Sequence, residues 1–184
     1  VVHYCGLPMY STSGCTDTKK MDVQSAMEAS LSINAAMMSG ANFVHDNGYT
    51  ESGLTGDIFQ CVMDDEIISM ARVIERGVEV NEETMAVEQI KNVGPGGHYL
   101  YEEHTMKWFR NHWMPTLMDR NSYENWEAQG RKTMKDRVLE KTRDLIKNYE
   151  GPRNKVPEKA DQEIEKILKE AEERIKKEQT KPQA

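Results

Sequence analysis

Short apolar runs along the first half of the chain alternate with longer stretches in which apolar residues recur every three or four positions. The runs around residues 9–10 and over Ala41–Val44 predict strands. The stretches that follow them predict helices, one from Asp22 to Met38 and one from Ile58 to Arg76, with Asp22 and Asp57 as N-caps. Strand, loop and helix occur twice in this order, which is typical of parallel strands joined by right-handed crossovers. The pattern therefore predicts an α/β fold.

The second half of the chain predicts helices separated by turns. Asn81 caps a helix that ends at the glycines of residues 94–97, and a short helical segment follows over residues 102–111. Thr133 caps a helix to Tyr149, and a last, highly charged helix runs from about residue 157 to 178. This last helix places apolar residues at heptad spacing: Ile164, Leu168, Ala171 and Ile175. Such a seam docks on its parent domain or on another subunit, so a homo-oligomer is one expectation.

The composition of the chain argues against some classes of binding partner and favours one cellular compartment. The chain has 184 residues and a net charge of −7, with acidic and basic residues interspersed, which argues against nucleic acid and anionic membranes as partners. The chain has three widely spaced cysteines, Cys5, Cys15 and Cys61. An odd number at such spacing argues against a disulfide framework or a zinc site, and it favours the reducing cytoplasm. No apolar run approaches the roughly 18–20 residues of a membrane span. Val1 stands first, inside an apolar element, so we expect that a segment upstream is missing.

Polar loops follow both predicted strands. The loop over residues 11–18 is rich in hydroxyl groups and contains Cys15. The loop after the second strand carries several ionisable or polar side chains: His45, Asp46, Tyr49 and Glu51. Chemistry in parallel α/β proteins is concentrated at the carboxyl ends of the strands, although solvated polar loops without a function are equally common. The pattern alone leaves both interpretations open.

Three other features favour structural roles. No Cys–His partnership for Cys15 can be identified from the sequence, so a loop cysteine without chemical duty is the favoured interpretation. The glycines of residues 94–97 follow a helix and lack the spacing of a phosphate-binding loop, which indicates a turn. Residues 64–66, two aspartates and a glutamate within the second helix, predict a solvated face or an ion-pair network. No metal site is expected.

Ordered motifs spread over most of the chain carry a family resemblance. They are Gly6-Leu7-Pro8, Asp17-Thr18-Lys19, Asp22-Val23-Gln24, Gly40-Ala41-Asn42, Gly48-Tyr49-Thr50-Glu51-Ser52-Gly53, Gln60-Cys61-Val62-Met63-Asp64, Glu82-Glu83-Thr84-Met85-Ala86-Val87, Gly94-Pro95-Gly96-Gly97-His98 and Leu117-Met118-Asp119-Arg120, with Trp126 beyond. In this order they resemble the trimethylamine methyltransferase family. Its members transfer a methyl group from a methylated amine to a separate corrinoid protein, a reaction that links them to methanogenesis.

The resemblance implies a TIM barrel, in agreement with the alternation of strands and helices. A complete (β/α)₈ barrel needs about 250 residues, more than this chain contains. Residues 1–100 would then supply the C-terminal βα units of the barrel, and residues 101–184 a helical C-terminal extension. We expect this fragment to be inactive without the other units of the barrel.

The resemblance also implies a site. Cys15 stands where the methanogen trimethylamine enzymes carry pyrrolysine before a Ser-Asp-Ala-Lys run, and Thr16-Asp17-Thr18-Lys19 follows it here. The chain thus resembles the branch that lacks pyrrolysine and uses quaternary amines such as glycine betaine. Phe59 replaces a glutamate of the trimethylamine enzymes, which removes an acid from that position. The expected substrate-binding residues are His45, Tyr49, Asp46, Glu51 and Gln60.

A quaternary amine as substrate would explain why Cys15 and Phe59 replace the pyrrolysine and the glutamate of the trimethylamine enzymes. Its nitrogen is permanently cationic, so transfer of a methyl group to Co(I) releases a neutral amine without any proton transfer, and the site needs aromatic faces and correct placement rather than an acid. We expect no cofactor bound to this chain itself, because the corrinoid (cobalamin) is carried by the partner protein, and the substrate is a small methylated amine. The alternatives are a tertiary-amine (trimethylamine) enzyme and an inactive truncated chain that acts only as an interaction module.

Overall fold

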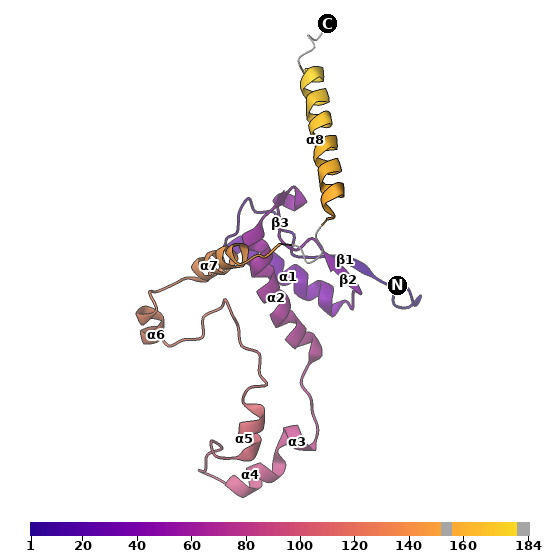
Figure 1. Cartoon of the computed structure of the whole chain (residues 1–184). Helices are drawn as coiled ribbons and strands as arrows, with labels where there is room; N and C mark the ends of the chain where they lie inside the picture. The colour runs from indigo at the N-terminus through magenta and orange to yellow at the C-terminus, as the bar shows by residue number, and fades with distance from the viewer. Residues whose placement is uncertain (152–155, 180–184) are drawn as a thin grey trace. The chain divides into compact units, whose positions relative to one another are not determined.

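Two βα units make up the first part of the computed structural model, which describes residues 1–151 and 156–179, with side chains up to residue 176. They comprise β1 (Tyr10–Thr12), α1 (Val23–Met38), β2 (Phe43–His45) and α2 (Ile58–Arg76) (Figure 1). Strands β1 and β2 pair in parallel, with Tyr10 opposite Phe43 and Thr12 opposite His45. The mixed α/β class and the parallel pairing are confirmed, and the closed barrel stays a prediction.

Both long helices begin where the sequence predicts. The Asp22 side chain accepts a hydrogen bond from the Ser25 N–H at 3.1 Å, and Ser25 Oγ accepts one from the Asp22 N–H, which forms a capping box. Asp57 accepts hydrogen bonds from the N–H groups of Phe59 and Gln60 at the start of α2. The predicted second strand is displaced: it begins at Phe43, so His45 belongs to the strand and not to the loop.

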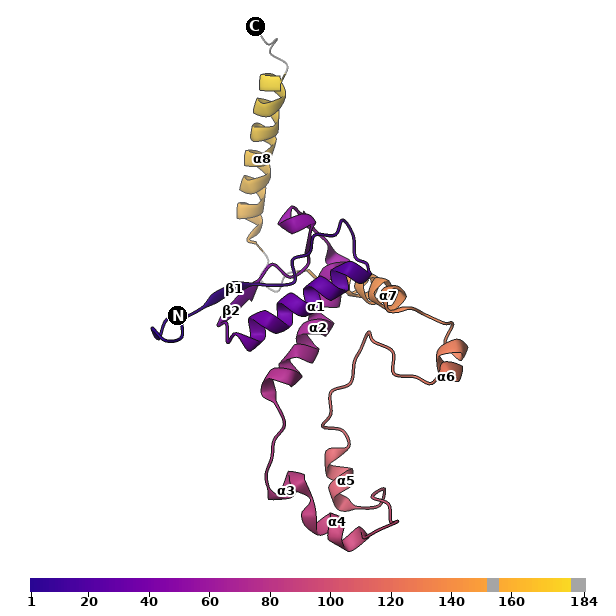
Figure 2. The same cartoon turned by 180° about the vertical axis from the view of Figure 1, so that it is seen from behind.

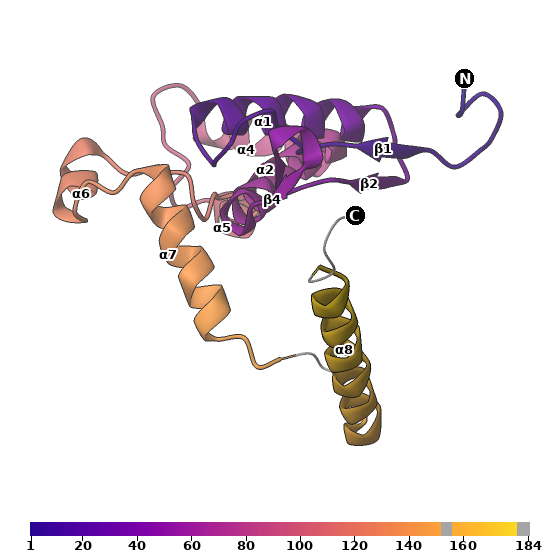
Figure 3. The same cartoon turned by 90° about the horizontal axis from the view of Figure 1, so that it is seen from above.

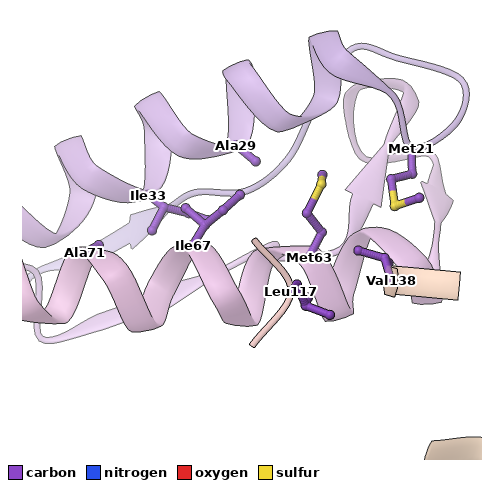
Figure 4. Close-up of a cluster of buried hydrophobic side chains, with 8 residues drawn as sticks. All are labelled: Met21, Ala29, Ile33, Met63, Ile67, Ala71, Leu117 and Val138. Carbon is purple, nitrogen blue, oxygen red and sulfur yellow. The ribbon is translucent and has the colours of Figure 1, made fainter. Parts of the chain in front are cut away.

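The hydrophobic core lies between α1 and α2, and α7 (Met134–Lys147) closes one end of it. Helix α1 packs on α2 and on β1, and α7 packs on α2. Ala29 and Ile33 of α1 face Met63 and Ile67 of α2 (Figure 4). The small side chains of α1 allow this close approach of the two helices. The remaining buried core residues come from both halves of the chain: Met21, Ala71, Leu117 and Val138.

One face of the two strands is exposed, and the helices cover the other face. Figure 2 shows β1 and β2 side by side, and Figure 3 shows α1 running along them. Val44 of β2 lines a small cavity with Ile33 and Met37 of α1 and Ile68 of α2, so this face of the strand is turned toward the helices. The opposite face carries Tyr10, which is largely exposed. Any chemistry on the open face therefore lies on the side away from the helices.

The other elements are short, apart from the last helix. A hairpin of β3 (Tyr49–Thr50) and β4 (Thr55–Gly56) around the turn η1 (Glu51–Gly53) was not predicted. The short helices are α3 (Glu82–Met85), α4 (Val87–Val93), α5 (Glu103–Trp108) and α6 (Tyr123–Ala128), and the last helix is α8 (Glu158–Gln179). The single helix predicted from Asn81 to Gly94 is wrong, because Ala86 adopts a positive φ of 51° that divides it into α3 and α4.

Contacts divide the chain into two units, residues 1–147 and 148–184. The first contains the core and the second contains α8, whose Ile164 and Leu168 are about half exposed. The predicted boundary at residue 100 concerns the complete protein and stays a prediction. Within the first unit, however, Leu117 and Val138 belong to the same core as α1 and α2. Part of the predicted helical extension is thus integral to the packing of the βα units.

The prediction of a solvated acidic face on α2 is wrong for two of its three residues. Asp64 and Glu66 are buried, whereas Asp65 is exposed. Glu66 accepts hydrogen bonds from the Thr116 hydroxyl at 2.7 Å and from the N–H groups of Leu117 and Met118 at 2.8 and 3.1 Å. Burial alone raises the pKa of Glu66, but the hydrogen bonds, led by that from Leu117, outweigh it and hold the pKa below its ordinary value. Glu66 thereby fixes residues 116–118 against α2.

Replacing Glu66 by alanine is expected to destabilise the chain by about 2 kcal/mol or more, because buried backbone N–H groups lose their acceptor. Asp65→Ala, on the exposed side of the same helix, is the matched control and is expected to cost less than about 0.5 kcal/mol. Because the folded-state pKa of Glu66 is lowered, its contribution is complete above the unfolded-state pKa and is lost as the pH falls through the folded-state pKa. Urea unfolding at neutral and acidic pH measures both effects; equal losses in the two variants would contradict them.

Candidate functional site

The loops that follow β1 and β2 lie side by side. The Ser13 N–H donates to the His45 carbonyl at 2.9 Å and continues the parallel pairing by one residue. Further on, the Thr16 N–H donates to the Tyr49 carbonyl at 3.0 Å, and the Glu51 N–H donates to the Thr18 carbonyl at 2.7 Å. The two polar loops identified in the sequence therefore form one continuous surface at the carboxyl ends of the strands.

Three aromatic rings stack on the open face of the sheet. The ring of Tyr10 lies parallel to that of Phe43, with centroids 5.1 Å apart, and stacks on that of His45 at 4.3 Å. Tyr10 and Phe43 are 63% and 58% exposed. We call Tyr10, Phe43 and His45 the ring stack. Exposed aromatic faces of this kind suit a cationic ligand.

An imidazole–carboxylate pair borders the ring stack. His45 Nδ1 lies 2.5 Å from Asp46 Oδ1, and both side chains are about one-third exposed. Asp46 has a positive φ of 75°. The pair places a carboxylate beside the rings, where it adds an electrostatic attraction for cations.

Cys15 lies on the loop after β1, as the sequence predicts, and is partly buried. Its thiol pKa is raised above the ordinary value, mainly by burial and then by the negative charges of Asp46, Asp17 and Glu28. A raised pKa favours the neutral thiol, which is a weak nucleophile. Asp46 of the imidazole–carboxylate pair is thus one of the charges that act on the Cys15 thiol. The environment therefore fits a lining residue.

The other predicted site residues differ in their exposure to solvent. Tyr49 lies in β3 and is 42% exposed, while Glu51 lies in the η1 turn and accepts a hydrogen bond from the Thr55 hydroxyl at 3.1 Å. Gln60 is fully buried at the start of α2, and its amide donates to Asp64 Oδ1 at 2.7 Å. The structure pairs His45 with Asp46, whose charge acts on the Cys15 thiol, and buries Gln60 within α2. Substrate contact by any of these residues stays a prediction.

Asp64 is the residue of this region that the sequence analysis missed. It is fully buried, and its Oδ2 accepts the Gly48 N–H at 2.7 Å. Burial raises its pKa to about 6, against the opposing effect of the hydrogen bonds from Gly48 and Gln60. The signal that could have found it is periodicity, because Gln60, Asp64, Ile67 and Ala71 follow the helical spacing of one face. Two polar residues on a face that is otherwise apolar indicate a buried polar pair.

Two glycines allow the loops to approach each other and α2. Gly48 has a φ of +85°, and a Cβ added there would lie 2.8 Å from Cys61 Cβ. Gly14 has a φ of +72°, and its Cβ would lie 2.5 Å from Asn47 Oδ1 and 3.0 Å from Asp64 Oδ2. Both positions combine a backbone conformation that disfavours side chains with a lack of space for one.

Metal-binding groups and membrane-spanning helices are both absent from the part of the chain that the structure describes. Within it, no three histidine, cysteine, aspartate or glutamate residues come together in a group that could hold a metal ion. Among the described helices, none has the length and apolar character required to cross a bilayer.

Parallel strands with helices packed on one of their faces define an α/β protein. A sequence model of the family described as trimethylamine methyltransferase (MTTB) matches residues 2–176 of this chain. The chain belongs to this family. The resemblance drawn from the sequence motifs is thereby confirmed.

Individual relatives include enzymes named for different amines. The chain is 33% identical over 172 residues to the trimethylamine methyltransferase MttB of Desulfitobacterium hafniense, covering 94% of this chain and 34% of that protein. It is 34% identical over 154 residues to a glycine betaine methyltransferase of the same species, covering 83% and 32%. For MttB of Methanosarcina barkeri the identity is 33% over 150 residues, covering 82% and 30%. The chain thus spans about a third of the length of these curated relatives.

Gly48→Ala is expected to destabilise the chain by about 2 kcal/mol or more, because it adds left-handed backbone strain to a close contact with Cys61. Gly56→Ala is the matched control, since Gly56 has no positive φ and its Cβ would meet nothing within 4 Å. Urea or thermal unfolding of the two variants measures the difference. Equal stability of both variants would show that the loop does not pack on α2 in this way.

Proposed function

We propose that the complete protein transfers a methyl group from a quaternary amine to the Co(I) corrinoid of a separate corrinoid protein. Membership in the trimethylamine methyltransferase family supports the reaction class. The observation that carries the choice of donor is the exposed ring stack of Tyr10, Phe43 and His45. The similar identities to trimethylamine and glycine betaine enzymes do not favour either amine.

The ring stack suits a cation that has no N–H group. A quaternary ammonium ion cannot donate hydrogen bonds, so aromatic faces are its main source of recognition, at about 0.5–2 kcal/mol each. The Asp46 carboxylate beside the rings adds attraction without needing a proton from the ligand. In a TIM barrel the helices lie outside the strands, so rings on the face away from α1 and α2 would face the barrel interior.

The chemistry assigned to the chain is binding and placement. Cobalt in the Co(I) state, carried by the partner, supplies the nucleophile that accepts the methyl group. The residues of this chain fit the amine side of that reaction: the rings hold the cation, and the strand ends orient one C–N bond for in-line displacement. The amine departs neutral, so no side chain has to give or take a proton. Cys15, held as a neutral thiol, forms part of the wall.

One observation favours a tertiary-amine donor instead. The Asp46 carboxylate, paired with His45, could accept a hydrogen bond from the N–H of a trimethylammonium ion and favour this protonated form, which releases neutral dimethylamine when a methyl group is transferred. The third alternative, an inactive interaction module, is supported by the exposed apolar residues of α8 alone. A transfer assay with several donors distinguishes the three.

The complete protein is expected to methylate a Co(I) corrinoid faster from glycine betaine or another quaternary amine than from trimethylamine. The physical reason is that a quaternary donor is cationic at every pH and always releases a neutral amine, whereas trimethylamine releases one only while its nitrogen carries a proton. Loss of the Co(I) absorbance with each donor measures the rates. Faster transfer from trimethylamine than from every quaternary amine would establish the tertiary-amine alternative, and absence of transfer from all donors would favour the interaction module.

Removing an aromatic face is expected to weaken amine binding. In the complete protein, Tyr10→Leu and Phe43→Leu should each raise KM for the quaternary donor by about 3- to 30-fold, the range that corresponds to about 0.5–2 kcal/mol, with kcat little changed. Tyr10→Phe keeps the ring and should retain most of the affinity. Tyr4→Leu, at a tyrosine that is 95% exposed outside the stack, is the surface control. An unchanged KM in both leucine variants would remove the ring stack from the site.

A further inference from the structure

A buried carboxylate connects the loops of the proposed site to α2. Asp64 is fully buried, and each of its oxygens accepts one hydrogen bond of 2.7 Å, Oδ2 from the Gly48 N–H and Oδ1 from the Gln60 amide. The Gly48 carbonyl in turn accepts the Asp57 N–H at 2.8 Å. Gly48 is thus held to the first turns of α2 through both of its backbone polar groups.

The loop after β1 meets the same carboxylate. The position of a Cβ on Gly14 lies 3.0 Å from Asp64 Oδ2 and 2.5 Å from Asn47 Oδ1, so both loops pass within van der Waals distance of one side chain. The Ser32 hydroxyl of α1 accepts the Gly14 N–H at 3.0 Å. Three segments that are distant in sequence therefore converge on Asp64: residues 13–15, residues 46–48 and the start of α2.

We propose that Asp64 is a positioning residue of the amine site: its carboxylate holds the loop after β2 against α2 and thereby fixes His45 and Tyr49 at the strand ends. Asp64 has no exposed surface through which to touch a substrate, so it acts through Gly48. For its activity readout this inference rests on the proposed methyl transfer. Its structural readout, the protection of the Gly48 amide, is independent of that function.

Because of its surroundings, Asp64 titrates in a different pH range from an ordinary aspartate. Burial raises its pKa to about 6, so half of the carboxylate is protonated near that pH, where an ordinary aspartate is still charged. On α2 the titratable neighbour is Cys61, whose thiol pKa is raised by burial and then by Asp64 and Asp65. The two loops present glycine backbone to Asp64; Cys15 and Tyr49 are the titratable residues next to those glycines in sequence, and Asp46 lies two positions before Gly48.

Replacement of Asp64 by asparagine separates hydrogen bonding from charge. The side-chain oxygen of the asparagine can accept the Gly48 N–H, and its amide can donate to Gln60 Oε1, a buried oxygen that has no hydrogen-bond partner in the part of the chain that the structure describes. Asp64→Asn therefore conserves the attachment of the loop and abolishes titration. Asp64→Ala removes both. Asp65→Ala, one residue further along α2 and exposed, is the matched control.

The test uses the complete protein and measures methyl transfer from amine to Co(I) together with hydrogen exchange at the Gly48 amide. We expect Asp64→Ala to lower kcat/KM and to speed Gly48 exchange, each at least tenfold, and Asp64→Asn to stay within about threefold of the wild type at pH 7.5. Because protonated Asp64 offers the same acceptor and donor as asparagine, protonation near pH 6 should leave the Gly48 contact in place, and the kcat/KM of the wild type and of Asp64→Asn should follow the same course as the pH decreases through about 6. Asp65→Ala should match the wild type in every measurement.

A purely structural role predicts a different result. In that case Asp64→Ala lowers the unfolding temperature, but the folded fraction keeps its kcat/KM; this outcome would overturn the proposal. Unchanged exchange at Gly48 in Asp64→Ala would also overturn it. If the wild type transfers no methyl group from any amine, the proposed function fails, while the exchange measurement still decides whether Asp64 holds the loop.

Discussion

The parallel pairing of β1 with β2 is the constraint on which the other features of the first unit depend. It is only three residues long, yet its register places Tyr10 beside Phe43 and Thr12 beside His45. The same register brings both following loops to one edge, where Ser13 continues the backbone pairing. A slip of β2 by one residue would turn Phe43 and His45 toward the helices and place Val44 beside Tyr10 on the open face. The helices therefore do more than bury one face of the strands. Their packing also stabilises the strand register in which the rings are exposed.

Two buried carboxylates on α2 complete this arrangement from opposite directions. Asp64 binds the loop that leaves β2, and Glu66 binds residues 116–118 through their hydroxyl and N–H groups. The two environments differ in their effect on the proton. Burial dominates at Asp64 and raises its pKa, whereas the larger set of donors around Glu66 outweighs burial and lowers its pKa. One helix thus carries two acidic anchors that respond to different ranges of pH.

Much of this fold follows from the sequence because local signals agree with the packing. Asp22 and Asp57 cap their helices as predicted, and the parallel strands follow from the alternation of elements. The break at Ala86 was missed because alanine favours helices and nothing local announces its positive φ. The burial of Asp64 and Glu66 was missed because the donors that stabilise them lie 16 and about 50 residues away in the sequence. The position of Cys15 was predictable, whereas the stacking of Tyr10 on Phe43 required the strand register.

The loops are attached to α2 through backbone groups, which allows residues of the site surface to change in sequence independently. Gly14 and Gly48 contribute no side chain, and Asp64 meets them beneath the surface, so the attachment of the loops is separate from the surface that they border. Residues on the open face of the strands, such as Phe43, can change without touching that attachment. A lineage can therefore exchange one ligand preference for another through a few strand substitutions while inheriting the same underlying scaffold. Relatives named for trimethylamine and for glycine betaine, at nearly equal identity to this chain, are compatible with such a history.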